Sequence, residues 1–254
     1  MTDVKHLGWD LDAWVNVLGK LKLEAPAVGF SFSIKQPDGV ERLRDNMRFC
    51  EMIKHAQEGN SFYADPENHS CDAGIYIMGK SVPSVYSTGE YGAGLQIFNH
   101  TRVARRIYDF IPKLDAGSNI SYVSFSPLEK LTFTPDLLLL LAGVETTEIL
   151  LRALSYSTGK MWTSKYSSVL GCAWIYVYPY LTGELNYTVT GLSFGMKAKK
   201  IFQPGLQLIS IPHDLFGTML HNLQTMPLVL PMFGPDGDEF RTKLRIDLGL
   251  DPKH

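Results

Sequence analysis

The sequence is poor in cysteine: 254 residues contain only three, Cys50, Cys71 and Cys172. Their number is odd and no two of them form a C-x-x-C pair, so we expect no framework of disulfides. Few and unpaired cysteines are typical of a reducing compartment. The first six residues also lack the basic and then apolar layout of a signal peptide, and we therefore expect a cytoplasmic location.

Long apolar runs, an excess of one charge and phosphate-binding loops are missing as well. The longest apolar stretches, 137–144 and 171–181, are far shorter than the roughly 20 residues of a membrane-spanning helix, so we predict core strands and no membrane partner. Lys and Arg number 24 against 26 Asp and Glu, a balance that argues against a nucleic-acid partner. Neither a G-x-G-x-x-G nor a G-K-S/T sequence indicates a nucleotide site.

What the chain does contain is a regular succession of helix and strand patterns. Apolar residues recur at spacings of three and four over 8–23 and again over 46–58, where Cys50 lies on the inner stripe. Residues 27–34 alternate with a period near two, as a strand does. Similar patterns predict strands at 71–79, 120–125, 137–144, 171–181 and 206–211, and helices at 99–110, 146–157 and 214–224.

The stretches around Cys71 and Cys172 resemble each other. Each cysteine is followed within five residues by Ile-Tyr, and each is preceded by a glycine, Gly59 or Gly159, that ends a predicted helix. The cysteines are 101 residues apart and the glycines 100, so the register is nearly constant. We interpret this pattern as an internal repeat.

The repeat predicts an α/β (or α+β) fold made of two related βαβ-type halves. The halves would pack across a pseudo-twofold axis and form a mixed sheet covered by helices. We expect an N-terminal helix over 1–24, a first half over 25–130, a second half over 131–216, and a C-terminal helix and tail over 217–254. Together these parts would form one compact unit.

The three cysteines are the candidate metal ligands. If the halves pack face to face, Cys71 and Cys172 begin equivalent strands after polar loops, and Cys50 lies on a helix before the first of them. Three thiolates can hold a 4Fe-4S cluster and leave its fourth iron free for a substrate or a redox role, because thiolate is the preferred ligand of such clusters. A zinc site that adds His69 is the alternative metal hypothesis, and three buried packing cysteines without any cofactor are the simplest one.

A second candidate site consists of basic residues. Arg102 and Arg105 in the first half and Lys197 in the second would form an anion-binding rim if the pseudo-symmetry brings them together, although two solvated helix faces explain them as well. The alternative function is therefore a metal-free protein that binds a small molecule in a pocket between the halves. The partner would be a small-molecule ligand or an electron-transfer protein, and a homo-oligomer is left open.

A set of short sequences spread over nearly the whole chain also resembles one protein family. They are Pro26-Ala27-Val28, Phe49-Cys50 with Ala56 and Gly59, Cys71 with Gly79, Ser126-Pro127-Leu128-Glu129, Pro135-Asp136 and Ile211-Pro212. Their order is similar to that of the prokaryotic family called domain of unknown function 169. The resemblance implies a cytoplasmic protein of anaerobic bacteria and archaea with cysteines at the positions of Cys50 and Cys71, and it implies no particular reaction.

Overall fold

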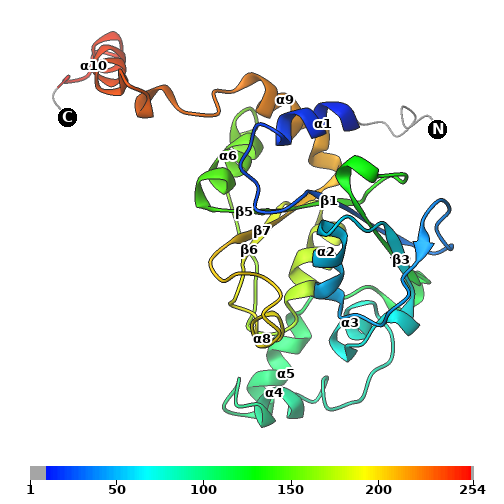
Figure 1. Ribbon diagram of the computed structural model, residues 1–254. Helices are drawn as coiled ribbons and strands as arrows, with labels where there is room; N and C mark the ends of the chain where they lie inside the picture. Colours follow the sequence, from blue (N-terminus) through cyan, green and yellow to red (C-terminus); the bar gives the residue numbers. More distant parts are fainter. Residues whose placement is uncertain (1–9, 253–254) are drawn as a thin grey trace.

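The computed structural model describes residues 10–252, which fold around one seven-stranded sheet (Figure 1). The strand order is β2-β3-β4-β1-β5-β7-β6, and neighbouring strands are antiparallel except β2 and β3, which are parallel. The predicted α/β class, with a mixed sheet covered by helices, is confirmed. The strands are β1 Val28–Ser33, β2 Glu41–Arg42, β3 Phe62–Ala64, β4 Tyr122–Pro127, β5 Leu137–Ala142, β6 Asn186–Val189 and β7 Gln207–Pro212.

Helices cover both faces of this sheet (Figure 1). On one face α1 Leu11–Leu18, α6 Val144–Ser155 and α9 Phe216–Thr225 share a hydrophobic core. The other face carries α2 Phe49–Gln57, α3 Asp72–Ile77, a π-helix Ala173–Val177 that continues into α7 Tyr178–Thr182, and α8 Phe194–Ala198. Helices α4 Glu90–Gly94 and α5 Thr101–Phe110 pack against each other at the end of this layer that is distant from the sheet (Figure 1). Residues 8 and 9 of the predicted first helix lie outside the described part of the chain.

Most of the apolar run at 137–144 forms strand β5, as predicted, and residues 137–142 make up this strand. All six residues of β5 are buried, because Leu137, Leu139 and Leu141 face one core and the residues between them face the other. The sequence of a strand that is covered on both faces is a continuous apolar run and does not alternate between polar and apolar residues.

The two predicted halves occupy opposite sides of the sheet, but the predicted pseudo-twofold symmetry is not confirmed. Strands β1 to β4 lie on one side and β5 to β7 on the other, and the halves meet where Gly29 of β1 pairs with Leu138 of β5. Helices α2 and α6, which correspond to each other in the predicted repeat, pack on opposite faces of the sheet. The helix that shares the face of α2 in the second half begins instead after Cys172.

The strands predicted at 71–79 and 171–181 are wrong, since both stretches are helical. Asp72–Ile77 forms α3, and Ala173–Val177 forms the π-helix. Both segments are short and mostly apolar, and in such a run the spacing of residues does not separate a buried strand from a buried helix. The strands that the patterns missed, β2, β3 and β6, have only two, three and four residues.

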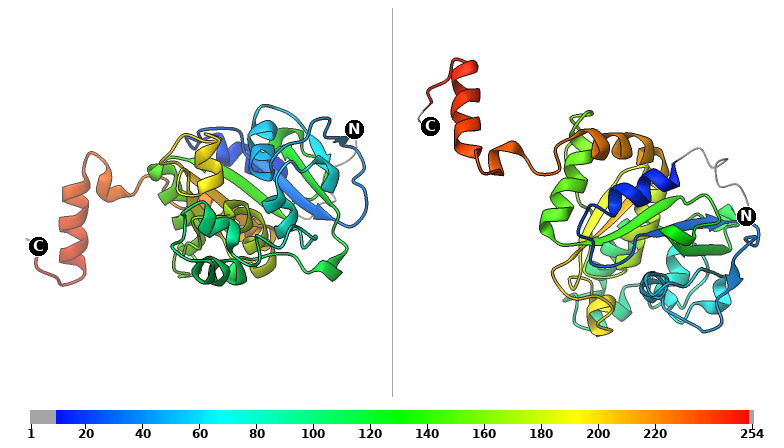
Figure 2. Two further views of the ribbon diagram at one scale, coloured as in Figure 1. Left: turned by 90° about the horizontal axis from the view of Figure 1, so that it is seen from below. Right: turned by 45° about the horizontal axis from the view of Figure 1, so that its top comes forward.

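The C-terminal segment leaves the body of the molecule (Figure 2). Where the sequence predicted only a tail after the helix near 214–224, the chain forms α10 Gly237–Asp247, which packs against the short turn Pro231–Phe233. Phe240, Leu244 and Leu248 recur at helical spacing on α10 and are each more than a third exposed.

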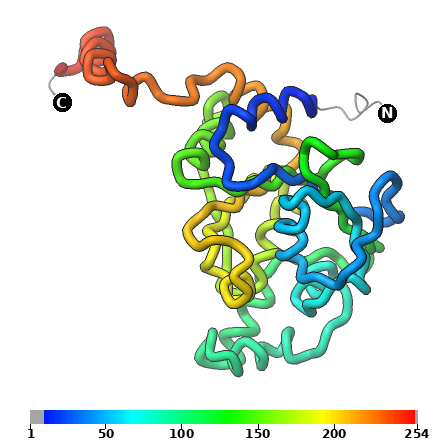
Figure 3. The backbone as a smooth tube through the Cα atoms, in the orientation of Figure 1, coloured from blue at the N-terminus to red at the C-terminus, as the bar shows by residue number. Residues whose placement is uncertain are grey.

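Besides the pairing of β1 with β5, aromatic contacts join the two halves, among them one between α2 and the π-helix, which lie side by side (Figure 3). The rings of Phe49 and Tyr176 are stacked with centroids 4.2 Å apart, and the ring of Phe30 lies 4.7 Å from that of Tyr176. The hydroxyl of Tyr176 donates a hydrogen bond of 2.8 Å to the backbone carbonyl of Phe49. Because Cys50 follows Phe49 and Cys172 precedes the π-helix, this contact holds the two cysteines on neighbouring elements.

We predict that Tyr176→Phe lowers the free energy of unfolding by about 1 kcal/mol, since the stacked ring remains and only the buried hydrogen bond is lost. Denaturation with urea measures the change. Tyr156→Phe is the matched control, because Tyr156 is 53% exposed and its loss of a hydroxyl is expected to leave stability unchanged. Equal stability of the two variants would contradict the prediction.

Candidate functional site

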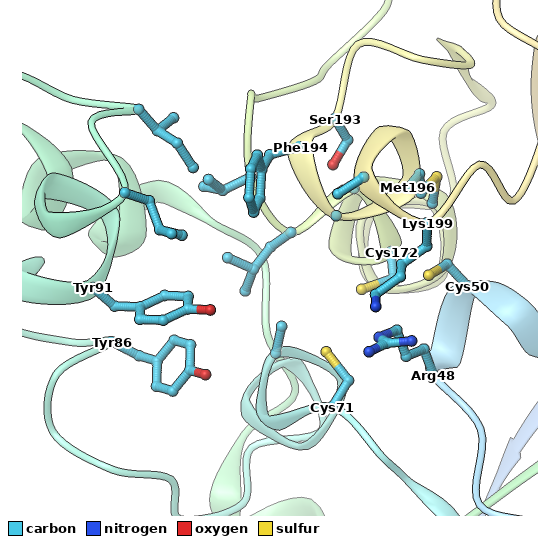
Figure 4. Close-up of a pocket in the computed structure, with 18 of the residues that line it drawn as sticks. Arg48, Cys50, Cys71, Tyr86, Tyr91, Cys172, Ser193, Phe194, Met196 and Lys199 are labelled. Carbon is cyan, nitrogen blue, oxygen red and sulfur yellow. The ribbon is translucent and has the colours of Figure 1, made fainter.

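A cavity of about 220 Å³ lies between segments of the two halves (Figure 4). Residues between 48 and 108 form one side of it and residues between 169 and 199 form the other. Its volume is somewhat below the range of 300–1,000 Å³ that is typical of ligand pockets in general. The cavity is therefore suited to a small ligand or cofactor.

All three cysteines line this cavity, each from a different segment. Cys50 is the second residue of α2, Cys71 directly precedes α3, and Cys172 directly precedes the π-helix. Cys50 and Cys172 are buried, whereas Cys71 is partly exposed. The three cysteines thus line one cavity, and they lie at the starts of helices and not of equivalent strands. Their ligation of a metal stays a prediction.

The two buried thiols have strongly raised pKa values. Burial raises the pKa of Cys50 to about 12, and the neighbouring Cys71 and Glu51 add to the rise. Burial also raises the pKa of Cys172 well above its ordinary value, with further contributions from Cys50 and Cys71. A helix start favours a thiolate, but desolvation outweighs that effect here. Cys50 and Cys172 are therefore neutral thiols at neutral pH, unless a cationic ligand displaces their protons.

Two cations, Arg48 and Lys199, are the charged side chains that line the cavity, and no described lining residue is a carboxylate. Figure 4 shows the guanidinium of Arg48 and the ammonium of Lys199 pointing toward each other among the three sulfur atoms. Arg48 is paired with Glu51, whose Oε1 lies 3.2 Å from Nη1, and the backbone N–H of Arg48 donates to Oε2 of the same residue at 2.9 Å. The carboxylate of Glu51, which does not line the cavity, thus pairs with Arg48.

The remaining wall is apolar and aromatic. Tyr86 and Tyr91 have ring centroids 5.0 Å apart, and the hydroxyl of Tyr86 donates to Oδ2 of Asp72 at 3.0 Å. Figure 4 shows both tyrosines facing the space opposite the cysteines. Burial and the hydrogen bond to Asp72 raise the pKa of Tyr86, so it is a neutral phenol. Leu95, Ile97, Phe194 and Met196 complete this wall.

The backbone is strained around the cavity. Only four described non-glycine residues have positive φ, and three of them line it or adjoin lining residues: Leu170 at 51°, Gln96 at 56° and Lys200 at 50°. Such conformations cost of order 1 kcal/mol each and cluster at functional sites in other proteins. The π-helix that follows Cys172 is a second irregularity of this kind. Neither feature can be recognised from the spacing of residues in the sequence.

The basic residues predicted for an anion-binding rim do not line the cavity. Arg102, Arg105 and Lys197 are exposed, and none of them is among its lining residues. The sequence analysis missed Arg48 and Lys199 as site residues, because lone basic residues near helix ends are common. The proximity of Arg48 to Cys50 was the available signal. That the predicted three bind an anion remains untested.

His69, the additional ligand of the zinc hypothesis, does not line the cavity either. Its side chain is buried, its ring lies 5.0 Å from that of Phe49, and both ring nitrogens lack a hydrogen-bond partner in the described structure. Within residues 10–252 no group of three His, Cys, Asp or Glu side chains is arranged to hold a metal ion.

Comparisons with known proteins give a family. The model of the DUF169 family, described as Uncharacterised ArCR, matches residues 18–222. Among curated proteins, the Uncharacterized protein MJ0308 of Methanocaldococcus jannaschii is 29% identical over 136 residues, which cover 52% of this chain and 58% of that protein. No solved structure matches the chain. None of the helices described here has the length and apolar character that a membrane crossing requires.

We predict that His69 makes the protein sensitive to acid. Burial lowers the pKa of His69 from 6.5 to about 4, so between these pH values the unfolded chain binds a proton that the folded chain does not. Stability then falls as the pH drops through this window, by about 2 to 3 kcal/mol between pH 7 and 4.5.

Denaturation of wild-type and His69→Leu protein at pH 7 and 4.5 measures this contribution. The variant is expected to lose less stability on acidification, whereas His221→Gln, which changes an exposed histidine, is expected to behave like the wild type. The same acid sensitivity in all three proteins would refute the role of His69.

We also predict that the three thiols react at different rates. Cys71 is partly exposed, whereas Cys50 and Cys172 are buried and have raised pKa values, so Cys71 is expected to react at least about tenfold faster with an aromatic disulfide reagent at pH 8. The reaction of the native, reduced protein is followed by absorbance. Cys71→Ser should remove the fast phase, and three equally fast thiols in the native protein would count against the described burial.

Proposed function

The chain belongs to the DUF169 family, and we propose that it binds an iron–sulfur cluster through Cys50, Cys71 and Cys172. The observation that carries the proposal is the lining of one cavity by three cysteines that are up to 122 residues apart in the sequence. Packing alone does not require cysteines from three separate segments to meet at the wall of a cavity.

The chemistry of the side chains fits a cluster better than a single ion. Thiolate sulfur is the usual ligand of iron–sulfur clusters, and each thiolate binds a different iron atom. The sulfurs therefore need not converge on one point, although the described residues contain no group of three His, Cys, Asp or Glu side chains suited to hold a metal ion. The positive charge of the irons would also displace the protons of Cys50 and Cys172, whose thiolates burial otherwise disfavours.

The other lining residues suit a buried anionic group. A cluster held by three thiolates carries net negative charge, which Arg48 and Lys199 would balance from the cavity wall. When bound, such a cluster supplies electron transfer or a Lewis-acidic iron. Three protein ligands leave one iron without a thiolate, and Tyr86 and Tyr91 line the cavity opposite the cysteines (Figure 4). The cavity favours a small-molecule ligand there over contact with an electron-transfer protein.

A metal-free pocket is the second candidate function. It is favoured by the aromatic and aliphatic wall, which resembles that of ordinary small-molecule sites. In this case the thiols are packing residues of the cavity and bind nothing. Zinc is not proposed, because His69 does not line the cavity.

Anaerobic purification followed by iron and sulfide analysis tests the first function. We expect a brown protein with a broad absorption band at roughly 400 nm, as cluster chemistry gives. Cys50→Ala, Cys71→Ala and Cys172→Ala should each lower the iron content strongly while the far-ultraviolet circular dichroism of a folded protein remains. Met196→Leu, a change at the same wall, is the control and should keep its iron.

A colourless wild-type protein without iron after anaerobic purification and after reconstitution with iron and sulfide would refute cluster binding. Stability measurements separate the two functions further. A packing cysteine is expected to cost about 1 kcal/mol on truncation and to leave the iron content unchanged.

A further inference from the structure

The cation pair in the cavity calls for an explanation, because like charges that converge repel each other. Arg48 and Lys199 point toward each other across the cavity wall (Figure 4). Glu51 compensates Arg48, and no described carboxylate forms an ion pair with Lys199 or lines the cavity. One positive charge at this wall is therefore left for a ligand to balance.

We propose that the cavity binds a small monocarboxylate with an apolar body, whose carboxylate lies between Lys199 and Arg48. The two cations come from different halves of the chain, since Arg48 precedes α2 and Lys199 follows α8. An anion bound between them would relieve their repulsion and link the two walls of the cavity.

The charge balance favours a carboxylate over a phosphate. Two cations and the single carboxylate of Glu51 leave one net positive charge, which a monoanion neutralises. A phosphate dianion is usually held by several backbone N–H groups of a glycine-rich loop, and the sequence has neither of the common loops of this type. A carboxylate needs only a few charged donors such as these.

The opposite wall selects an apolar body. Tyr86, Tyr91 and Phe194 offer aromatic surface on the side away from the cysteines (Figure 4). A volume of about 220 Å³ limits the ligand to a few atoms beyond its carboxylate or to one small ring. A small aromatic or branched aliphatic acid meets both requirements.

The inference concerns the same cavity as the proposed function, and it rests on that function only for the ligand's place beside the iron. A carboxylate held by Arg48 and Lys199 would lie close to the three sulfurs and thus to the iron that no thiolate binds. Recognition of the acid itself depends on the two cations and the aromatic wall, with or without a cluster.

Calorimetric titration of the full-length protein with benzoate tests the inference. We expect benzoate to bind and its neutral analogue benzamide not to bind measurably. Lys199→Gln should weaken benzoate binding about fivefold, because a charge-assisted contact of an exposed lysine is lost, and Lys199→Arg should retain most of it. Lys197→Gln is the matched control, since Lys197 lies two residues away and outside the cavity, and it should bind like the wild type.

Two results would overturn the inference: no benzoate binding at millimolar concentration, or equal binding by wild type and Lys199→Gln. Binding of phenyl phosphate in preference to benzoate would overturn the choice of a carboxylate. Iron in the same samples is measured separately. A colourless protein that binds benzoate through Lys199 supports the carboxylate site and not the cluster. An iron-loaded protein that does not bind benzoate supports the cluster and refutes the carboxylate site.

Discussion

The structure depends on the contact between the start of α2 and the π-helix. Phe49 and Tyr176 stack there, and the tyrosine hydroxyl bonds to the backbone of the other half. A hydrogen bond and ring stacking in a closed interior permit only a narrow range of positions. Because Cys50 follows Phe49 and Cys172 directly precedes the π-helix that carries Tyr176, the same contact also positions these two cysteines at the wall of the cavity. The packing between the two halves therefore also determines the geometry of the site.

Burial gives this cavity its chemical character. Two thiols are held neutral by desolvation, while two cations remain charged at the same wall. Lys199 is exposed and no described carboxylate forms an ion pair with it, so its positive charge attracts an anion. A thiolate-bound cluster and an organic anion would both be attracted by this charge, and the metal of a cluster would also displace the protons of the buried thiols.

Residues with unusual backbone conformations are concentrated around this site. Leu170, Gln96 and Lys200 adopt backbone conformations that side chains disfavour, and a π-helix follows Cys172. Elsewhere the positive φ angles fall on glycines and on Asn119, a residue type that tolerates them. Strain that is concentrated at one cavity has to be offset by the surrounding packing, here by the aromatic cluster beneath it. The family match spans 18–222 and so includes the whole cavity, while α10 lies beyond it.

The sequence by itself determined the long elements and the cysteines as candidate residues. Strands β1, β4, β5 and β7 and helices α5, α6 and α9 carry clear periodic patterns, because each buries one face or both against the sheet. Tertiary structure alone decided that the segments after Cys71 and Cys172 are helices, that α2 and α6 lie on opposite faces, and that Arg48 and Lys199 join the cysteines. The reason is physical. In a short and mostly apolar segment, the alternation of polar and apolar residues is too brief to distinguish a helix from a strand. The approach of side chains that are far apart in the sequence depends on how the elements pack, which no local pattern records.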